Sequence, residues 1–195
     1  MTRVKPKPGR QSGAWHNQAV RVSARADYAL RACAELAVAG DARLKRDAIA
    51  ARQDIPVEFL ESVLLALKHA GIVQSQRGAS GGFRLARPPT DISLADVIRA
   101  VDGPMADVRG GRPEEVTYPG PAARLQDIWI ALRASLREVL EGTTLEALVE
   151  DRLPEEVRRL AATPDAWVSL GRVRRSHHPA DEDAAPSLAG SRKSG

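Results

Sequence analysis

Apolar residues after position 23 recur at spacings of three and four, which predicts a series of helices. The first helix should end at Gly40, because glycine readily adopts the conformation that terminates a helix. A short helix within residues 46–53 and a turn at Asp54 should follow. Pro56 can then open a third helix without losing a hydrogen bond, and Gly71 should end it. The apolar positions of the first helix are Tyr28, Leu30, Cys33, Leu36 and Ala37, and those of the third are Phe59, Leu60, Val63, Leu64 and Leu67.

Residues 74–87, QSQRGASGGFRLAR, place glycines between two short strand-like runs. Gly78, Gly81 and Gly82 should let the backbone reach positive φ, so the stretch predicts a β-hairpin with a thin tip. Arg77 stands at the rim of that tip, and two further arginines follow on the second strand. A slim cationic finger suits a phosphate-lined groove, although a surface hairpin that happens to be basic is the alternative. Two helices joined by a tight turn and followed by such a hairpin form a winged helix-turn-helix.

A fourth helix should begin after Ser93, which is a suitable N-cap because Asp96 lies three residues on. Residues 103–121 contain eight glycines and prolines and predict a long loop. The helix that follows, from Ala122 to Leu140, has apolar residues alternately three and four apart, which is a heptad seam. That seam consists of Ala122, Leu125, Trp129, Leu132, Leu136 and Val139. It predicts a helix that pairs with a second copy of the chain, and the alternative is packing on the winged domain.

Charge is unevenly distributed along the 195 residues, whose formal net charge is +4. Residues 1–90 carry 15 Lys and Arg against 7 Asp and Glu, whereas residues 91–195 carry 14 against 18, so the halves are +8 and −4. This asymmetry favours a polyanionic partner for the first half. No membrane-spanning run or secretory signal is evident, and a single cysteine excludes an internal disulfide, so we expect a cytoplasmic protein. No nucleophile–base pair, phosphate-binding lysine loop or metal triad is present, which argues against an enzyme.

Three segments carry a resemblance to a known family: ADYALRA, AIAARQDIPVEFLESVLLALKHAGIVQSQRGASGGFRLARPP and ISLADVIRAVDGP. Their order resembles the Rrf2 family of bacterial transcription regulators over about residues 20–104. The resemblance implies a mainly α fold, with a winged helix-turn-helix domain, a two-stranded β wing and a long dimerisation helix. Members are typically homodimers that bind an imperfect palindrome in double-stranded DNA and repress or activate transcription. We therefore expect a disordered basic arm (1–19), a DNA-binding domain (20–104), a loop (105–121), a helical dimerisation region (122–170) and a disordered tail (171–195).

The resemblance also implies roles for individual residues. Val57, Glu61 and Ser62 should face base edges in the major groove, with the Glu61 carboxylate accepting a hydrogen bond from a cytosine amino group. Arg77 should enter the minor groove, where narrow A·T-rich DNA concentrates negative potential. Ser23 and Arg25 match positions that touch phosphate. For Glu61, Arg77 and Arg25 the alternative is a solvated side chain.

The sequence departs from the family in residues 103–121, where cluster-binding members carry three cysteines and this chain has none. We therefore expect no iron–sulfur cluster, no metal and no other cofactor, and we assign Cys33 to the core. The alternative is a cluster held by this one cysteine together with histidine and carboxylate partners. A second hypothesis is a winged sensor or interaction module that responds to a small-molecule or protein effector. Tyr118 and Trp129 are candidate lining residues for such an effector, and their alternative role is packing.

Overall fold

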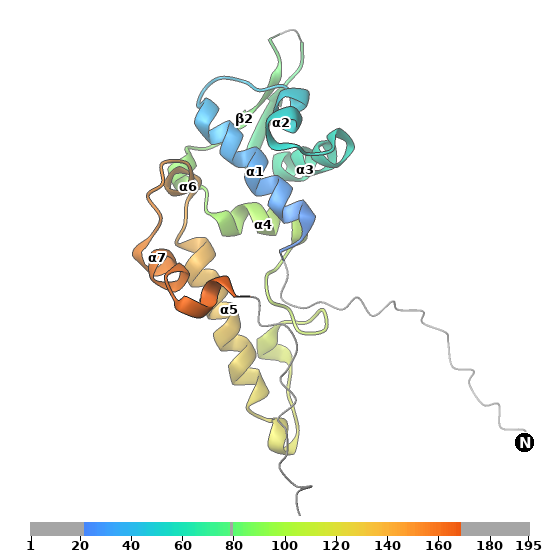
Figure 1. The fold of residues 1–195 in the computed structure, drawn as a ribbon. Coiled ribbons are helices and arrows are strands. Elements are labelled where there is room, and N and C mark those ends of the chain that lie inside the picture. The colour runs from blue at the N-terminus through green and yellow to red at the C-terminus, as the bar shows by residue number, and fades with distance from the viewer. Residues whose placement is uncertain (1–21, 79, 169–195) are drawn as a thin grey trace, which may run out of the picture. The chain divides into compact units, whose positions relative to one another are not determined.

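A computed structural model describes residues 22–78 and 80–168, which contain seven helices and one hairpin (Figure 1). The chain divides into two compact units, Met1–Arg159 and Leu160–Gly195. The basic arm and the tail expected from the sequence lie outside the described residues. No helix in the described part of the chain is both long and apolar enough to cross a bilayer. The helices are α1 (Ala24–Ala39), α2 (Arg46–Gln53), α3 (Val57–His69), α4 (Leu94–Asp102), α5 (Leu125–Glu141), α6 (Leu145–Val149) and α7 (Glu155–Ala161), and the strands are β1 (Val73–Gln76) and β2 (Gly82–Leu85).

Local signals set both ends of α1 and the end of α2 where the sequence places them. Ser23 caps α1 by accepting a hydrogen bond from the Ala26 amide, and Gly40 ends it with a positive φ of 59°. Asp54 ends α2 in the left-handed conformation, with φ and ψ both 50°, and turns the chain into α3. The helix-turn-helix is therefore set by local chemistry at two helix ends.

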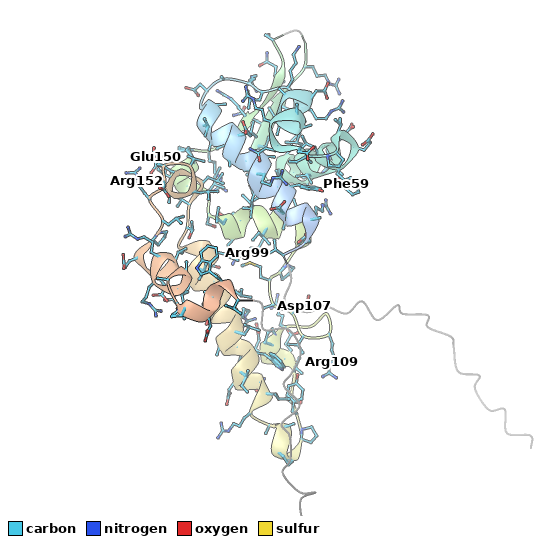
Figure 2. All side chains as sticks on the ribbon, in the orientation of Figure 1. Phe59, Arg99, Asp107, Arg109, Glu150 and Arg152 are labelled. Carbon is cyan, nitrogen blue, oxygen red and sulfur yellow. The ribbon has the colours of Figure 1, made fainter. Side chains whose placement is uncertain are left out.

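The core lies between α1, α3, α4 and the base of the hairpin. Leu60, Val63, Leu64 and Leu67 of α3 are all buried, as the apolar pattern predicts. Phe59 is the exception, because 62% of its surface is exposed. The expected apolar face of α3 is thus wrong at this one position, since residue 59 lies about 100° around the helix from Leu60, on the flank of the buried stripe. Figure 2 shows its ring on the outer side of α3.

The hairpin pairs β1 and β2 antiparallel, from Val73 opposite Leu85 to Gln76 opposite Gly82. Its base is held to the chain before α2 by two backbone hydrogen bonds of 2.9 and 2.8 Å between Leu44 and Phe83. The hairpin is therefore a wing that is tied to the helical core at one end.

The three glycines of the wing serve different purposes. Gly78 and Gly82 have positive φ values of 105° and 152°, as expected. Gly81 does not, so the expected reason for it is wrong: a Cβ there would lie 2.4 Å from the carbonyl oxygen of Gln76. A Cβ at Gly82 would lie 2.6 Å from the carbonyl oxygen of Leu44. Gly81 thus allows close backbone packing within the wing, and Gly82 allows close packing of the wing against Leu44.

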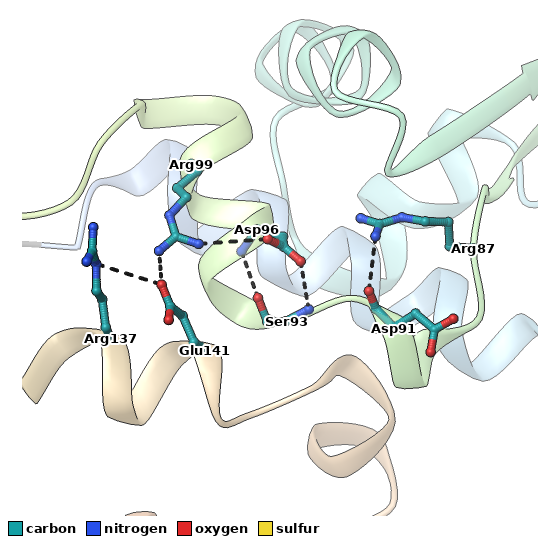
Figure 3. Close-up of polar contacts among 7 residues, drawn as sticks. All are labelled: Arg87, Asp91, Ser93, Asp96, Arg99, Arg137 and Glu141. Carbon is teal, nitrogen blue, oxygen red and sulfur yellow. Dashed lines mark hydrogen bonds and ion pairs between the residues drawn. The ribbon is translucent and has the colours of Figure 1, made fainter. Parts of the chain in front are cut away.

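Helix α4 begins with the expected capping box between Ser93 and Asp96. The chain beyond α5 returns to this point, where the Leu94 amide donates to the Thr143 carbonyl and the Leu145 amide donates to the Ile92 carbonyl, both at 2.9 Å. Figure 3 shows the ion pairs beside these bonds, in which Arg99 of α4 contacts Glu141 of α5 and Asp96. The C-terminal end of α5 is therefore anchored to the winged fold by backbone, side-chain and core contacts.

Helix α5 begins at Leu125, three residues later than the apolar pattern suggests. Ala122 lies instead in a single 3-10 turn, Gly120–Ala122, which two prolines precede or occupy. Proline fixes φ and removes a backbone donor, so the regular helix starts only after this turn.

Candidate nucleic-acid interface

Helix α3 presents a polar outer side next to the wing. Glu61 and Ser62 are exposed there and Val57 is half-buried, so two of the three expected base-contacting side chains lie at the surface. The Ser62 hydroxyl donates to the Phe59 carbonyl within the helix, at 2.9 Å. Sequence reasoning missed Glu58 and Leu65, which are also exposed on this side. The helical spacing from residue 58 to 65 contains the signal, because these two positions lie opposite the buried stripe.

An aromatic contact joins this side of α3 to α1. The Phe59 and Tyr28 rings meet edge to face, with centroids 6.4 Å apart and planes at 65°. The Arg31 guanidinium lies over the Tyr28 ring at 5.7 Å. Phe59 therefore contacts Tyr28 of α1 while most of its surface remains exposed.

Glu61 is not an isolated carboxylate. Its Oε2 is 2.9 Å from Nη1 of Arg46, the first residue of α2, while Arg46 Nε donates to Asp47 at 3.1 Å. The pKa of the Arg46 guanidinium is raised above its ordinary value, first by the hydrogen bond to Asp47 and then by the charges of Asp47 and Glu61. Arg46 was not singled out from the sequence, because a residue pair 15 positions apart leaves no local pattern.

Arg77 directly follows β1 at the rim of the wing tip, and its side chain is exposed, as the sequence predicts. Behind it, Arg84 of β2 lies 3.4 Å from the exposed Asp41, and Arg87 donates to the Asp91 carbonyl at 3.1 Å. Of these three arginines, Arg77 alone makes no hydrogen bond or ion pair to another described residue. The wing tip thus carries a cation that is available to a phosphate or a base edge.

The two expected phosphate contacts at the start of α1 differ in their surroundings. Arg25 is exposed, with no ion pair to another described residue. The Ser23 hydroxyl is occupied, because it caps α1 and donates to Asp102 Oδ2 at the end of α4, at 2.5 Å. Contact between Ser23 and phosphate would have to use its backbone amide or break the bond to Asp102.

Helix α5 carries the expected seam on a surface that the rest of the described chain covers only in part. None of its side chains is buried by the rest of the described chain, although it is 17 residues long. The five seam residues within it, Leu125, Trp129, Leu132, Leu136 and Val139, are all half-buried. Ile128 is 54% exposed beside them. Such an apolar surface on a helix is typical of an interface with another chain.

Residues 103–121 are held against α5 by side chains. Trp129 donates from Nε1 to the Tyr118 hydroxyl at 3.0 Å, and Arg133 pairs with Glu114 at 2.5 Å. The pKa of Glu114 is lowered, first by a hydrogen bond from its own backbone amide and then by the one from Arg133. The hydrogen bond between Trp129 and Tyr118 gives both side chains a partner within the chain, which favours packing over effector binding as their role.

Cys33, the single cysteine of the chain, is a poor ligand for an iron–sulfur cluster. Cys33 is fully buried in the core face of α1, and burial raises the pKa of its thiol to about 12, so the thiolate that binds a metal does not form at neutral pH. Within residues 22–78 and 80–168, no three His, Cys, Asp or Glu side chains come together in a metal-binding group.

Comparisons with known proteins agree with this fold. The family model Rrf2, described as an iron-dependent transcriptional regulator, matches residues 22–151. A Mycobacterium tuberculosis protein named as an HTH-type transcriptional regulator is 48% identical over 143 residues, which cover 73% of this chain and 89% of that protein. The HTH-type transcriptional regulator CymR of Bacillus subtilis is 35% identical over 130 residues, or 66% of this chain and 89% of CymR.

Solved structures of transcription regulators are also similar to this chain. The structure of B. subtilis CymR, described as the global cysteine regulator of that organism, has a TM-score of 0.59 at 33% identity and covers 68% of this chain and 98% of CymR. IscR of T. potens has a TM-score of 0.56 at 31% identity and covers 71% of this chain and 90% of IscR. These relatives are regulators of transcription and not enzymes. The chain described above belongs to the Rrf2 family of winged helix-turn-helix transcription regulators.

Proposed function

We propose that this protein is a homodimeric repressor that binds a palindromic operator in double-stranded DNA and works in the cytoplasm without an iron–sulfur cluster. One observation carries the proposal: the exposed polar side of α3 and Arg77, which has no hydrogen-bond or ion-pair partner among the described residues, belong to the same winged fold. The base of its wing is hydrogen-bonded to the chain before α2. A helix that enters the major groove and a wing that reaches the next minor groove together read one half-site.

Each part of residues 20–104 has a role in this proposal. Val57, Glu61 and Ser62 face base edges, and Glu61 accepts a hydrogen bond from a cytosine amino group. Arg77 enters the minor groove, while Gly78, Gly81 and Gly82 keep the wing thin enough to approach the duplex. Arg25 and the start of α1 at Ser23 contact phosphate and orient the domain. The excess of basic residues in the first half of the chain supports a polyanionic partner.

Residues 122–170 form the dimerisation region, with the seam on α5 at its centre. The partly covered seam supports this role, because a 17-residue amphipathic helix with no fully buried side chain, and with Ile128 exposed beside the seam, has more apolar surface than its own chain covers. Two winged units joined in this way would meet two half-sites related by a twofold axis, which is the symmetry of a palindrome.

The absence of cysteines from residues 103–121 and the burial of Cys33 support regulation that does not depend on a cluster. The signal would then be a small molecule or a partner protein. A winged module that acts only through such an effector, without reading DNA, is the second candidate. An uncommitted Arg77 on a basic wing favours DNA binding over that candidate, since a module that contacts only protein has no need of it.

Selection of bound sequences from random duplex DNA by the purified full-length protein tests the proposal. We expect a palindrome with two similar half-sites. Binding is then compared on that palindrome and on a scrambled duplex of equal length, at several salt concentrations. Equal affinity for both duplexes would exclude a sequence-specific regulator and leave the effector module. A reporter placed behind the selected palindrome separates repression from activation.

A further inference from the structure

The ion pair between α2 and α3 is the feature that the proposed recognition scheme leaves unexplained. Arg46 Nη1 and Glu61 Oε2 are 2.9 Å apart, and no other ion pair among the described residues reaches α3. The Glu61 side chain remains 69% exposed and that of Arg46 36% exposed, so the pair lies at the surface of the helix-turn-helix. Surface pairs contribute little to stability, which makes a purely structural purpose weak.

Charge on this side of α3 gives the pair a clearer purpose. Glu58, Glu61 and Asp47 are all exposed there, and three uncompensated carboxylates would be repelled by DNA phosphates. Arg46 contacts two of the three. The guanidinium has five N–H groups in a planar fork, and the contacts to Nη1 and Nε leave Nη2 without an acceptor among the described residues.

The position of Arg46 suits a phosphate on the edge of the groove. It is the first residue of α2, and in a helix-turn-helix the first helix crosses the DNA backbone while the second enters the groove. Since its guanidinium already reaches Glu61 on the second helix, it lies between the base-reading side chain and the place where the backbone passes.

We propose that Arg46 is a further DNA-contacting residue, which binds a backbone phosphate and, through its ion pair, positions the Glu61 carboxylate toward its base. The inference rests on the proposed sequence-specific DNA binding and deepens it. Glu61 orients Arg46 in return, so the two residues act as one unit in recognition. A carboxylate can then lie beside a phosphate, because the guanidinium between them attracts both anions and reduces the repulsion between them.

Arg46→Gln tests the phosphate contact, and Arg52→Gln is its matched control. Arg52 lies at the other end of α2 and pairs with Glu35 of α1 at 3.1 Å, so both variants lose one positive charge and one surface ion pair from the same helix. On the selected palindrome, each phosphate contact contributes about 0.9 to the slope of log affinity against log salt. A dimer that loses two contacts should therefore show a slope shallower by about 1.8 for Arg46→Gln, and unchanged for Arg52→Gln.

Two further variants test the positioning role. Arg46→Lys keeps the charge but not the planar fork, so it should restore most of the salt slope while the ratio of specific to scrambled affinity stays below that of the wild type. In a double-mutant cycle, Arg46→Gln and Glu61→Gln together should lower that ratio by less than the product of their separate effects. Thermal unfolding of all variants should be closely similar.

The outcomes separate this inference from the function it rests on. A wild-type protein with equal affinity for the palindrome and the scrambled duplex overturns both. If the wild type prefers the palindrome over the scrambled duplex but Arg46→Gln has the same salt slope as Arg52→Gln, only the Arg46 phosphate contact is overturned. Independent effects of Arg46→Gln and Glu61→Gln, or full recovery of discrimination by Arg46→Lys, overturn the positioning role.

Discussion

Replacing Gly81 by alanine should disable the wing without touching any charged residue. The new Cβ would lie 2.4 Å from the Gln76 carbonyl oxygen, 2.7 Å from the Arg77 carbonyl carbon and 2.8 Å from the Gly78 carbonyl oxygen. All three are backbone atoms, so no side chain can rotate away. Contacts shorter than 3.0 Å are essentially never seen for a Cβ, so the strands must separate by at least 0.6 Å, the difference between 3.0 and 2.4 Å.

The free-energy cost of Gly81→Ala depends on which part of the fold takes up the strain. Overpacking of this kind typically costs about 1–3 kcal/mol. The wing rests on four strand pairs and the contact with Leu44, so it is the part of the fold that yields. Arg77 would then be displaced from the groove, which should cost as much as Arg77→Ala, about 1–3 kcal/mol per half-site. For two half-sites this corresponds to a loss of affinity of about 30-fold to 10⁴-fold.

The assay is titration of the selected palindrome, with thermal unfolding in parallel. Ser80→Ala is the control, because Ser80 is an exposed neighbour on the same turn and its replacement adds no atom. It should bind as the wild type does. The double variant Gly81→Ala with Arg77→Ala should bind no worse than the weaker single variant, since both remove one contact. If Gly81→Ala has the affinity and melting temperature of the wild type, the wing geometry is refuted. If Gly81→Ala weakens binding but its effect adds in full to that of Arg77→Ala in the double variant, the link to Arg77 is refuted.

Three further predictions follow from the same structure. Replacing Leu132 and Leu136 by glutamate should convert a dimer into a monomer at micromolar concentration, because both lie on the α5 seam, which the rest of the chain covers only in part; a wild-type chain whose mass in solution is already that of a monomer would contradict this. The anaerobically purified protein should be colourless and bind its operator without iron, and stoichiometric iron with acid-labile sulfide would overturn that expectation. Cys33 should resist a thiol reagent at pH 8 until the protein is unfolded, since burial raises the pKa of its thiol to about 12. The free energy of unfolding should fall as the pH rises from about 9 toward 12, because in this range only the unfolded chain loses the thiol proton.

The sequence predicts the elements of this fold well because their ends depend on neighbouring residues. Gly40 ends α1, Asp54 ends α2 before α3, and the Ser93–Asp96 capping box opens α4. Each of these signals involves residues at most four positions apart in the sequence. The wing glycines are predicted for a partly wrong reason. Gly81 has no positive φ, and Gly82, which has one, also avoids a clash with Leu44 that no local turn signal indicates.

What the sequence could not predict depends on contacts between distant residues. Phe59 fits the apolar spacing of α3, yet it is exposed and rests on Tyr28 of another helix. A carboxylate at position 61 looks unfavourable beside DNA until its partner Arg46 is known. Ser23 suits phosphate by position, but its hydroxyl is bound to Asp102. Periodicity indicates which side of a helix is covered, and it gives no information about which side chains meet across helices.

Helix α4 connects the parts of the molecule that the proposed function requires to act together. At its start, two backbone hydrogen bonds and the fully buried Leu145 fix the end of α5. Along its length, Arg99 pairs with Glu141, and at its end Asp102 accepts the hydrogen bond from Ser23 at the start of α1 (Figure 3 shows the first of these contacts). Because a palindrome fixes the distance between two recognition helices, a dimer joined through α5 can read it only if α5 is held rigidly to α1 and α3. The contacts of α4 supply that rigidity, and any signal that loosened them would change the spacing of the two recognition helices before it changed either helix.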